Sequence, residues 1–378
     1  MMKASKCGER HRPIHMHPSQ RTKTVAISKE TKTRPASDGA EFLRPSEQLT
    51  DDQLVDLYRD IHLIRRFSER QVEEFESGRM PGGLHPGHGH EAISAAVPRA
   101  VRPSDYLNGT HRSQNGILAL RGVSFRRLWA EVFGRETGIN GGRRGVDLMG
   151  TFEDDIRVWA HNPVLGHNAG IATGAALALQ LDERDEVIVC LIGDGASVCG
   201  TVWEACFFAG IRKLPIVYAV ENNMVAYTTR FEDMSPIENI SDRASAFGFP
   251  GQLVDGNDAL AVLDAVHTAA ERARRGEGPT LLELKTYRFV GHFIGDPQVY
   301  RTREEVSEAR KSDPLHLFEA LLRDRGLLDD AAVTNIHHEN LERIDAGLAE
   351  AMLDPFPNPA DALSRTYRSG TYPMGYSS

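Results

Sequence analysis

The stretch VIVCLIGDG at residues 187–195 decides the fold of this chain of 378 residues. Its first six residues are all apolar, which is the length of a strand, and they end at a Gly-Asp-Gly turn. A second apolar run, IVYAV at residues 216–220, follows a segment of helical periodicity over residues 201–213. Fully apolar strands that alternate with helices are typical of parallel sheets buried on both faces. We therefore predict an α/β fold, a parallel sheet with helices on both faces.

Further elements extend this pattern along the chain. Thr50 is a good N-cap for a helix whose apolar residues recur at helical spacing up to residue 64. We also expect helices over residues 91–100 and 258–275 and short strands over residues 105–107 and 281–284. The segments 78–89 and 138–150 are rich in glycine and are expected to be loops.

Composition excludes several functional classes. The chain carries 44 Lys and Arg against 53 Asp and Glu, a formal charge of −9, which argues against a general nucleic-acid binder. No apolar run approaches the roughly 20 residues that span a bilayer, so an integral membrane protein is excluded. None of the four cysteines forms a Cys-x-x-Cys pair, which indicates free thiols and a cytoplasmic location rather than disulfides or zinc.

The charge is uneven and suggests a division of the chain. Residues 1–36 hold nine Lys and Arg against two Glu and contain few large apolar residues. We expect residues 1–45 to form a disordered basic arm, with an organellar targeting segment as the alternative. Residues 46–330 are expected to form the α/β domain and residues 331–378 a C-terminal helical extension and tail.

Two adjacent strand ends carry side chains that bind hard cations. Asp194 follows the first apolar run, and Asn222 and Asn223 follow the second. Ligands bind beyond the carboxyl ends of parallel strands, where these oxygens converge. Carboxylate and amide oxygens suit Mg²⁺, which takes its remaining ligands from water and phosphate, and Gly193 and Gly195 allow a close approach to an anion. The residues alone thus predict Mg²⁺ and a phosphorylated ligand.

Two other phosphate-binding patterns fit less well. Gly193, Gly195 and Gly200 are spaced too widely for the dinucleotide fingerprint, and no acidic residue stands where the ribose would need one. The chain also lacks the Gly-x-x-x-x-Gly-Lys-Ser/Thr loop of nucleotide hydrolases.

The arrangement resembles a known family. Gly-Asp-Gly at 193–195 with the later Asn223 is similar to the thiamine diphosphate motif. The chain also contains GHEA at 89–92, THR at 110–112 and TYRFVGH at 286–292, and these segments resemble, in the same order, those of the α subunits of 2-oxo acid dehydrogenases. The resemblance covers about residues 46–320 and looks closest to the acetoin dehydrogenase branch. It implies a thiamine diphosphate-binding domain of the type that holds the diphosphate.

The resemblance implies the ligands of the metal and the diphosphate. Asp194, Asn223 and the carbonyl of Val225 would hold Mg²⁺. The backbone of Gly193, Gly195 and Ala196 would contact the diphosphate of the cofactor.

Five further residues gain expected roles in the same way. His111 and Arg112 would contact the diphosphate oxygens, and the backbone of Pro163 and Leu165 would contact the aminopyrimidine. His85 would lie near the reacting carbon, and His292 at the phosphate end of the cofactor, both as catalytic residues. His88 and His90 have no counterpart and are expected at the surface or behind the site.

The resemblance also implies a function. The chain would be an oxidoreductase, the α subunit of a heteromeric E1 dehydrogenase that decarboxylates or cleaves a 2-oxo acid or acetoin-like substrate and passes the product to a lipoyl carrier. No second α/β domain is present to supply the pyrimidine pocket and its carboxylate, so we expect a β subunit in an α₂β₂ assembly, and a lipoyl-bearing E2 or another acyl carrier. Two alternatives remain: a two-carbon transferase delivering to another acceptor, and a non-catalytic subunit.

The departures from the family lie on the substrate side. Residues 144–149, Arg-Gly-Val-Asp-Leu-Met, replace the Gly-Gly-Ser-Met-His run of the family, and Pro163 replaces a glycine. The sequence therefore leaves the substrate and the acceptor open.

Overall fold

The computed structural model describes residues 45–153 and 156–361. These residues belong to one compact unit, 36–378. The predicted basic arm, except for Pro45, and the tail beyond residue 361 lie outside the described residues.

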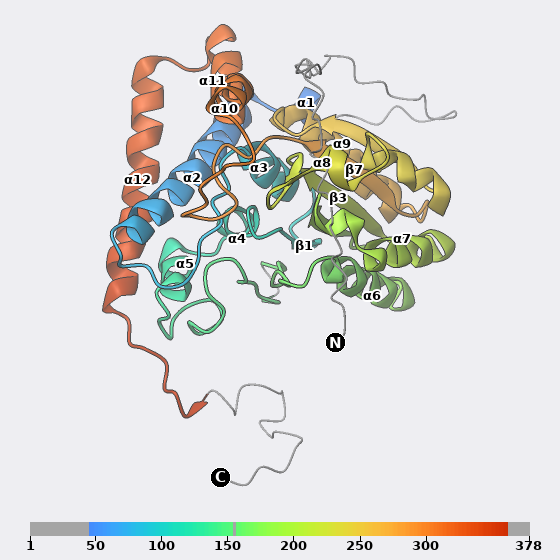
Figure 1. Cartoon of the computed structure of the whole chain (residues 1–378), viewed down its shortest axis with the longest axis horizontal. Coiled ribbons are helices and arrows are strands. Elements are labelled where there is room, and N and C mark those ends of the chain that lie inside the picture. The colour runs from blue at the N-terminus through green and yellow to red at the C-terminus, as the bar shows by residue number, and fades with distance from the viewer. Residues whose placement is uncertain (1–44, 154–155, 362–378) are drawn as a thin grey trace, which may run out of the picture. The chain divides into compact units, whose positions relative to one another are not determined.

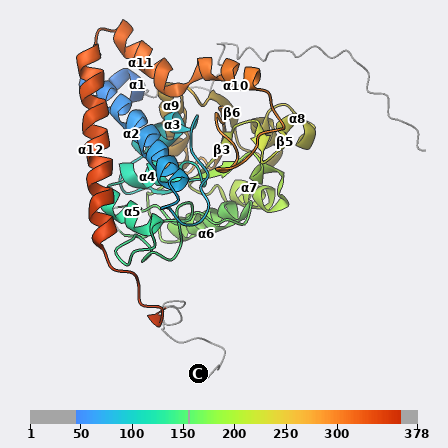
Figure 2. The same ribbon diagram turned by 60° about the vertical axis from the view of Figure 1, so that its left-hand side comes forward.

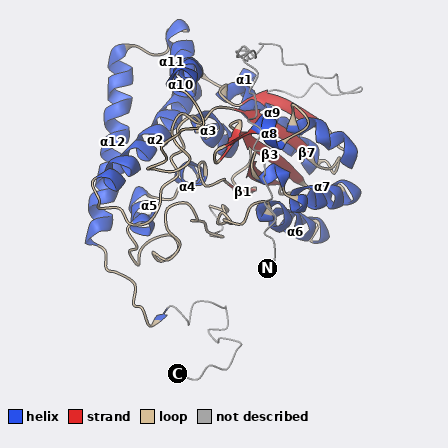
Figure 3. Cartoon of the chain, in the orientation of Figure 1, coloured by secondary structure: helices blue, strands red, loops and turns tan. Residues whose placement is uncertain are grey.

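A five-stranded parallel sheet forms the centre and confirms the predicted fold class. The strand order is β1-β2-β3-β7-β6 and every neighbouring pair is parallel. Figure 3 shows the strands in red with helices around them. The strands are β1 (Tyr106–Asn108), β2 (Ile188–Gly193), β3 (Ile216–Asn222), β6 (Gly251–Asp255) and β7 (Thr280–Lys285). The two apolar runs are thus adjacent central strands, with Ile188 paired to Ile216 and Gly193 to Glu221.

Alternation along the strands explains why both runs are apolar throughout. Val189 and Val217 pack into one hydrophobic cluster, whereas Cys190 and Tyr218 pack into another on the opposite face. All of these side chains are fully buried. A strand with a core on each face has no position left for a solvated polar side chain.

Helices supply both cores (Figure 1). On one face lie α6 (His167–Leu181), α7 (Gly200–Arg212) and the 3₁₀ segment η2 (Ile240–Phe247). On the other lie α3 (Glu91–Arg99), α4 (Gln114–Leu120), α5 (Phe125–Val132) and α9 (Ala259–Arg274). The short remaining elements are α1 (Pro45–Gln48), η1 (Ala196–Val198), β4 (Val225–Ala226), β5 (Thr229–Arg230), α8 (Phe231–Met234), α10 (Arg303–Ala309) and η3 (Arg310–Ser312).

Three long helices form a further layer outside α3 and α5. They are α2 (Asp51–Glu76), α11 (Pro314–Asp324) and α12 (Asp330–Leu353), and Figure 2 shows α12 running beside α2 and α5. Thr50 caps α2 through a reciprocal capping box with Gln53, as its N-cap signal predicts. The proposed boundary at residue 330 falls where α12 begins and stays a prediction.

A buried ion triad joins α2 and α11 to the start of α3. The Arg65 guanidinium donates to Glu91 at 2.5 Å and to both carboxylate oxygens of Asp313 at 3.0 and 3.1 Å. The other oxygen of Glu91 accepts the N–H of Gly89 at 2.9 Å. The triad therefore fixes the loop that precedes α3, and that loop carries His85, His88 and His90.

Parallel strands bring four loops to one edge of the sheet. These are the segments after β1 (109–112), after β2 (194–196), after β3 (223–226) and after β7 (286–292), and the loop 78–89 lies against the last of them. Phe289 donates its N–H to the carbonyl of His88 at 3.2 Å, and Ile294 donates to Leu84 at 3.0 Å. Among the described residues, no helix combines the length and apolarity needed to cross a bilayer.

Candidate functional site

The carboxylate of Asp194 uses one of its two oxygens for a hydrogen bond within the described residues. Its Oδ1 accepts the N–H of Gly195 at 2.8 Å, and its Oδ2, also buried, has no hydrogen-bond partner among the described residues. Burial raises the pKa of this carboxyl. A buried carboxylate oxygen without a donor is costly unless a cation or proton meets it, so this atom marks a place for a cation.

A chain of hydrogen bonds orients the amide of Asn223. Although burial opposes it, hydrogen bonding from His90 lowers the pKa of Glu221, which keeps that buried carboxylate ionised. His90 then donates from Nδ1 to Glu221 at 3.2 Å and accepts the Nδ2–H of Asn223 on Nε2 at 3.3 Å. Thr110 donates a further hydrogen bond to Glu221 at 2.5 Å. The nitrogen of Asn223 is thereby engaged, and its oxygen, which accepts the N–H of Val225 at 3.3 Å, keeps a second lone pair for a ligand.

The structure places His90 in one of the two positions expected for it. The side chain is 1 % exposed, so it lies in the interior behind the site rather than at the surface. His88 is half-buried, and burial lowers its pKa. Neither is a surface histidine.

Arg288 holds the turn that carries the third expected ligand. Its guanidinium donates to the carbonyl of Val225 at 3.3 Å and to that of Tyr227 at 3.0 Å, and it also meets the hydroxyl of Tyr300 at 2.6 Å. Met224 and Tyr227 adopt positive φ values of 67° and 54° there. The carbonyl oxygen of Val225 has a second lone pair for a metal ion, which would share this oxygen with the cationic side chain of Arg288.

Arg112 and His292 join three of the loops. Arg112 donates to the carbonyl of Pro86 at 2.7 Å and to that of His292 at 2.9 Å. Burial lowers the pKa of Arg112 to about 9, and burial with the neighbouring Arg112 lowers that of His292 to about 3. His292 is therefore neutral, with Nδ1 facing a guanidinium N–H at 3.2 Å and Nε2–H left to donate.

Histidine rings gather beside this pair. The ring of His85 lies 5.0 Å from that of His111 and 4.9 Å from that of His292, and Tyr227 lies 4.8 Å from His292. The buried Nε2 of His111 finds no partner within the described parts of the chain, and burial keeps the pKa of His111 well below its usual range. The structure thus brings together the two predicted diphosphate contacts and the two predicted catalytic histidines.

The glycine turn after β2 is shaped for close approach. A Cβ on Gly195 would lie 3.0 Å from the Cβ of Ala226, so that only glycine fits without displacing the turn after β3. A Cβ on Gly193 would meet open space. Ala196 opens η1 and is buried.

The two expected pyrimidine contacts lie elsewhere in the site. Pro163 and Leu165 stand in an exposed turn before α6, where the side chain of Leu165 is 58 % exposed. This turn is tied to the strand ends through His161, whose Nδ1 lies 3.1 Å from the carbonyl of Gly109 and 2.9 Å from the amide nitrogen of Asn168. Its outer side is open.

Three site residues were not assigned from the sequence. Glu221 and Arg288 lie within quoted motifs, beside Asn222 and ahead of Gly291-His292, so their place in the sequence was the available signal. Asp147 was noted only as a departure from the family, yet its Oδ2 lies 2.6 Å from Nδ1 of His85.

The donor set fits a magnesium diphosphate. One carboxylate, one amide oxygen and one carbonyl are hard ligands that leave positions for phosphate oxygens. No group of three or more His, Cys, Asp and Glu side chains in the described ranges forms a ready-made metal site. A metal here would therefore depend on the amide, the carbonyl and the ligand itself.

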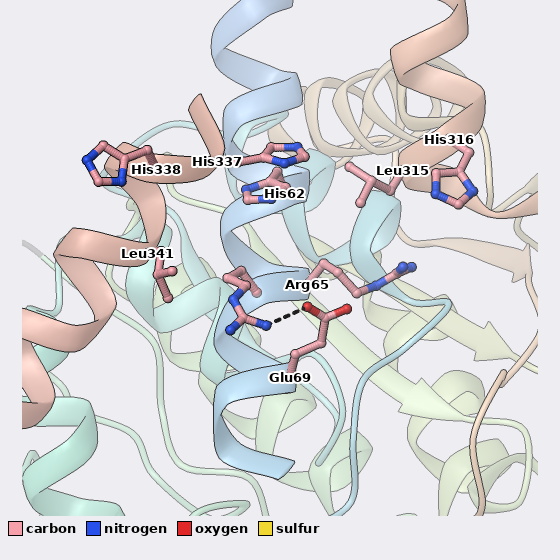
Figure 4. Close-up of a pocket in the computed structure, with 9 residues that line it drawn as sticks. His62, Arg65, Glu69, Leu315, His316, His337, His338 and Leu341 are labelled. Carbon is pink, nitrogen blue, oxygen red and sulfur yellow. Dashed lines mark hydrogen bonds and ion pairs between the residues drawn. The ribbon is translucent and has the colours of Figure 1, made fainter. Parts of the chain in front are cut away.

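A surface cavity of about 410 Å³ lies away from these loops, among α2, α11 and α12 (Figure 4). The rings of His62 and His337 stack there at 3.8 Å, and Arg66 pairs with Glu69 at 3.1 Å. Its cations are already paired with carboxylates, and it contains none of the strand-end residues. The cavity is therefore separate from the predicted site at the sheet edge.

Comparisons with known proteins assign the chain to one family. The sequence model of the dehydrogenase E1 component family matches residues 59–360. The α subunit of acetoin:2,6-dichlorophenolindophenol oxidoreductase from Bacillus subtilis is 34 % identical over 86 % of this chain and 97 % of its own length. The α subunit of 2-oxoisovalerate dehydrogenase from the same organism is 37 % identical over 84 % and 96 %. The pyruvate dehydrogenase E1 α subunit of Rhizobium meliloti is 32 % identical over 88 % and 95 %.

Proposed function

The chain belongs to the dehydrogenase E1 component family, and we propose that it is the α subunit of a thiamine diphosphate-dependent E1 enzyme made of two kinds of chain. It acts as an oxidoreductase on the oxo group of a 2-oxo acid or an acetoin-like ketone. The observation that carries the proposal is the carboxylate oxygen of Asp194 that has no partner in the described part of the chain, at the same sheet edge as the amide oxygen of Asn223.

The residues of this chain would bind the charged end of the cofactor. Asp194, Asn223 and the carbonyl of Val225 would hold Mg²⁺. The backbone of Gly193, Gly195 and Ala196 would contact the diphosphate, although the N–H of Gly195 is already donated to Oδ1 of Asp194.

The side chains around the diphosphate supply further donors. His111 presents its free Nε2, Arg112 its guanidinium and His292 its Nε2–H. When bound, thiamine diphosphate supplies the electron sink for the carbanion formed at the substrate carbon. His85, from the loop 78–89, faces the same group of rings and would serve proton transfer at the reacting centre.

A partner chain is needed to complete the site. The turn with Pro163 and Leu165 is open, and α6 behind it is apolar on its outer side as well as its inner side. Ile171 and Leu181 are 47 % and 66 % exposed, and Gly170 and Gly174 open onto free space. A helix that is apolar all round is normally buried. We propose that a β subunit covers this side in an α₂β₂ assembly.

The acceptor and the compartment follow from the same proposal. Relatives include α subunits named for acetoin, 2-oxoisovalerate and pyruvate, so the substrate is expected among these classes. The acyl or aldehyde unit would pass to a lipoyl-bearing E2 or a similar carrier. The free thiols of Cys190, Cys199 and Cys206 fit a reducing, cytoplasmic setting.

The experiment combines assembly with turnover. The chain is co-expressed with a candidate β chain from the same genome and examined by native mass spectrometry with Mg²⁺ and thiamine diphosphate. We expect four chains with two cofactors, and reduction of 2,6-dichlorophenolindophenol with acetoin, pyruvate or 2-oxoisovalerate. Full turnover by the purified chain alone would overturn the half-site proposal, and an assembled complex that binds no cofactor would overturn the assignment.

A further inference from the structure

His85 and Asp147 form a contact that the family resemblance does not account for. Nδ1 of His85 lies 2.6 Å from Oδ2 of Asp147, although the two residues stand 62 positions apart. Asp147 belongs to the stretch in which this chain departs from the family pattern. The histidine is 30 % exposed and the aspartate 13 %, so the ring borders the open side of the site while the carboxylate lies behind it.

The loop that carries Asp147 is held firmly. The carboxylate of Glu131 accepts the N–H groups of Asn140, Gly142 and Arg144 at 2.7 to 2.8 Å. Asn140 in turn exchanges two hydrogen bonds with the backbone of Gly150, at 2.8 and 3.1 Å. Hydrogen bonds therefore fix both ends of segment 140–150, and this ordered loop holds Asp147 beside His85.

The groups around His85 make Asp147 the carboxylate that faces it. His111 and His292 approach the ring at 5.0 and 4.9 Å, and Arg112 contacts His292. Burial raises the pKa of Asp147, while the hydrogen bond from His85 and the charge of Arg112 oppose this rise. Oδ1 of Asp147 has no partner in the described ranges, so the contact with His85 is the hydrogen bond on which its ionised form depends.

We propose that Asp147 is a positioning residue which turns His85 into a base for the hydroxyl proton of an α-hydroxy ketone, so that this site is built to cleave a ketol rather than to decarboxylate a 2-oxo acid. The inference rests on the proposed function and assigns its substrate class. A carboxylate that accepts the Nδ1–H of a histidine fixes the tautomer, leaves Nε2 as the proton acceptor and stabilises the imidazolium that forms.

The two reaction classes differ in their need for such a base. In a ketol, the bond between the carbonyl carbon and the carbinol carbon breaks, and the carbinol becomes an aldehyde. The hydroxyl proton must leave at the same time, here to Nε2 of His85, while the electron pair stays on the former carbonyl carbon. A 2-oxo acid loses CO₂ from a carboxylate that is already ionised, so no proton is removed. A base beside the reacting carbon therefore serves the first reaction.

Charge favours the same choice. A 2-oxo acid would bring a second carboxylate toward the side of the site that contains Asp147, and like charges at a poorly solvated site repel. A neutral ketol meets no such repulsion. The buried aspartate thus acts both by supporting His85 and by disfavouring the competing substrate.

The first test compares two substrates in the assembled α₂β₂ complex. We expect Asp147→Asn to lower kcat/KM for acetoin by about 100-fold, in the range of general-base contributions. The same substitution should lower kcat/KM for pyruvate by at most about 10-fold. His85→Gln should match the loss with acetoin, and the double variant should lose no more than the single ones, because the two residues act as a unit. Equal losses for the two substrates, or additive losses, would overturn the inference.

The wild-type complex separates this inference from the proposed function. If it decarboxylates pyruvate and does not cleave acetoin, the substrate class is wrong and the E1 assignment stands. If it binds cofactor and Mg²⁺ but acts on neither substrate class, both are wrong.

The second test needs no turnover. Histidine C–H to deuterium exchange at one fixed pH, followed by mass spectrometry on the cofactor-free complex, reports the exchange rate of each histidine peptide. In Asp147→Asn we expect the exchange rate at His85 to differ from that of the wild type, because the carboxylate that faces its Nδ1 at 2.6 Å is lost. His338 on α12, 68 % exposed and far along the chain, serves as the internal control. An unchanged exchange rate at His85 would refute the role of Asp147.

Discussion

Replacing Asp194 with asparagine should change stability in opposite directions with and without ligand. In the free chain one carboxylate oxygen accepts the N–H of Gly195 and the other is buried without a partner. Burial raises the pKa of this carboxyl above its unfolded value, so its ionisation costs stability at neutral pH when no cation is bound. Asparagine keeps an oxygen for Gly195 and removes the charge.

The magnitudes follow from these two atoms. An unsatisfied buried polar group costs about 1–3 kcal/mol, so relief of the carboxylate should stabilise the unliganded protein by about 1 kcal/mol. Ligand at 100 times its Kd stabilises a folded protein by about 2.7 kcal/mol. That gain should vanish in Asp194→Asn, because the metal loses its charged ligand.

Calorimetry of the assembled complex, with and without Mg²⁺ and thiamine diphosphate, measures both quantities. Asp255→Asn is the matched control, because Asp255 also ends a strand of the sheet and accepts a backbone N–H, that of Asn257, at 2.9 Å. This control variant should keep the full stabilisation by Mg²⁺ and thiamine diphosphate. The reasoning would be refuted if Asp194→Asn kept the Mg²⁺-dependent shift, or if it destabilised the unliganded protein by more than about 1 kcal/mol.

Three further outcomes are expected. Asp313→Asn keeps the N-cap of α11 but removes a charged partner from the buried guanidinium of Arg65. Urea unfolding should show that the free energy of unfolding drops by about 3 kcal/mol. A drop below about 0.5 kcal/mol would mean that the triad contributes little to stability. Burial and the neighbouring His337 lower the pKa of His62 to about 3, so the folded chain binds fewer protons than the unfolded chain between about pH 6.5 and 3. The free energy of unfolding should therefore decrease as the pH is lowered through that window, by up to about 1.4 kcal/mol per pH unit from this ring. His62→Gln should flatten this dependence between pH 7 and 5, and an unchanged dependence would assign the acid sensitivity to other groups. Gly174→Leu fills open space on α6 without straining the helix, so the variant chain should fold but fail to form the four-chain species in native mass spectrometry, and normal assembly would remove α6 from the interface.

Residue pattern was sufficient for the two central strands and the parallel topology, but it did not predict β6 or α6. The runs at 187–192 and 216–220 could only be strands with a core on each face, and they pair as predicted. Parallel topology then brought Asp194 and Asn223 to one edge without any knowledge of side-chain positions. Here local sequence and global fold point the same way.

Contacts between loops that are distant in the sequence could not be predicted from the residue pattern. The pairing of His85 with Asp147 depends on how Glu131 anchors a glycine-rich segment, and nothing in either local sequence encodes that distance. For His90 the sequence left two positions open, because the partner that allows its burial, Glu221, comes from a distant strand of the sheet.

The apolar outer side of α6 has a consequence for how the chain is made. Ile171, Leu181 and the open glycines beside them stay in water until another chain covers them. Copies synthesised in excess of that partner would associate with one another or be degraded, since exposed apolar surface promotes both. With the proposed β subunit as that partner, one helix sets a requirement for balanced synthesis of the two chains, and overproduction of this chain alone should yield less soluble protein than co-expression.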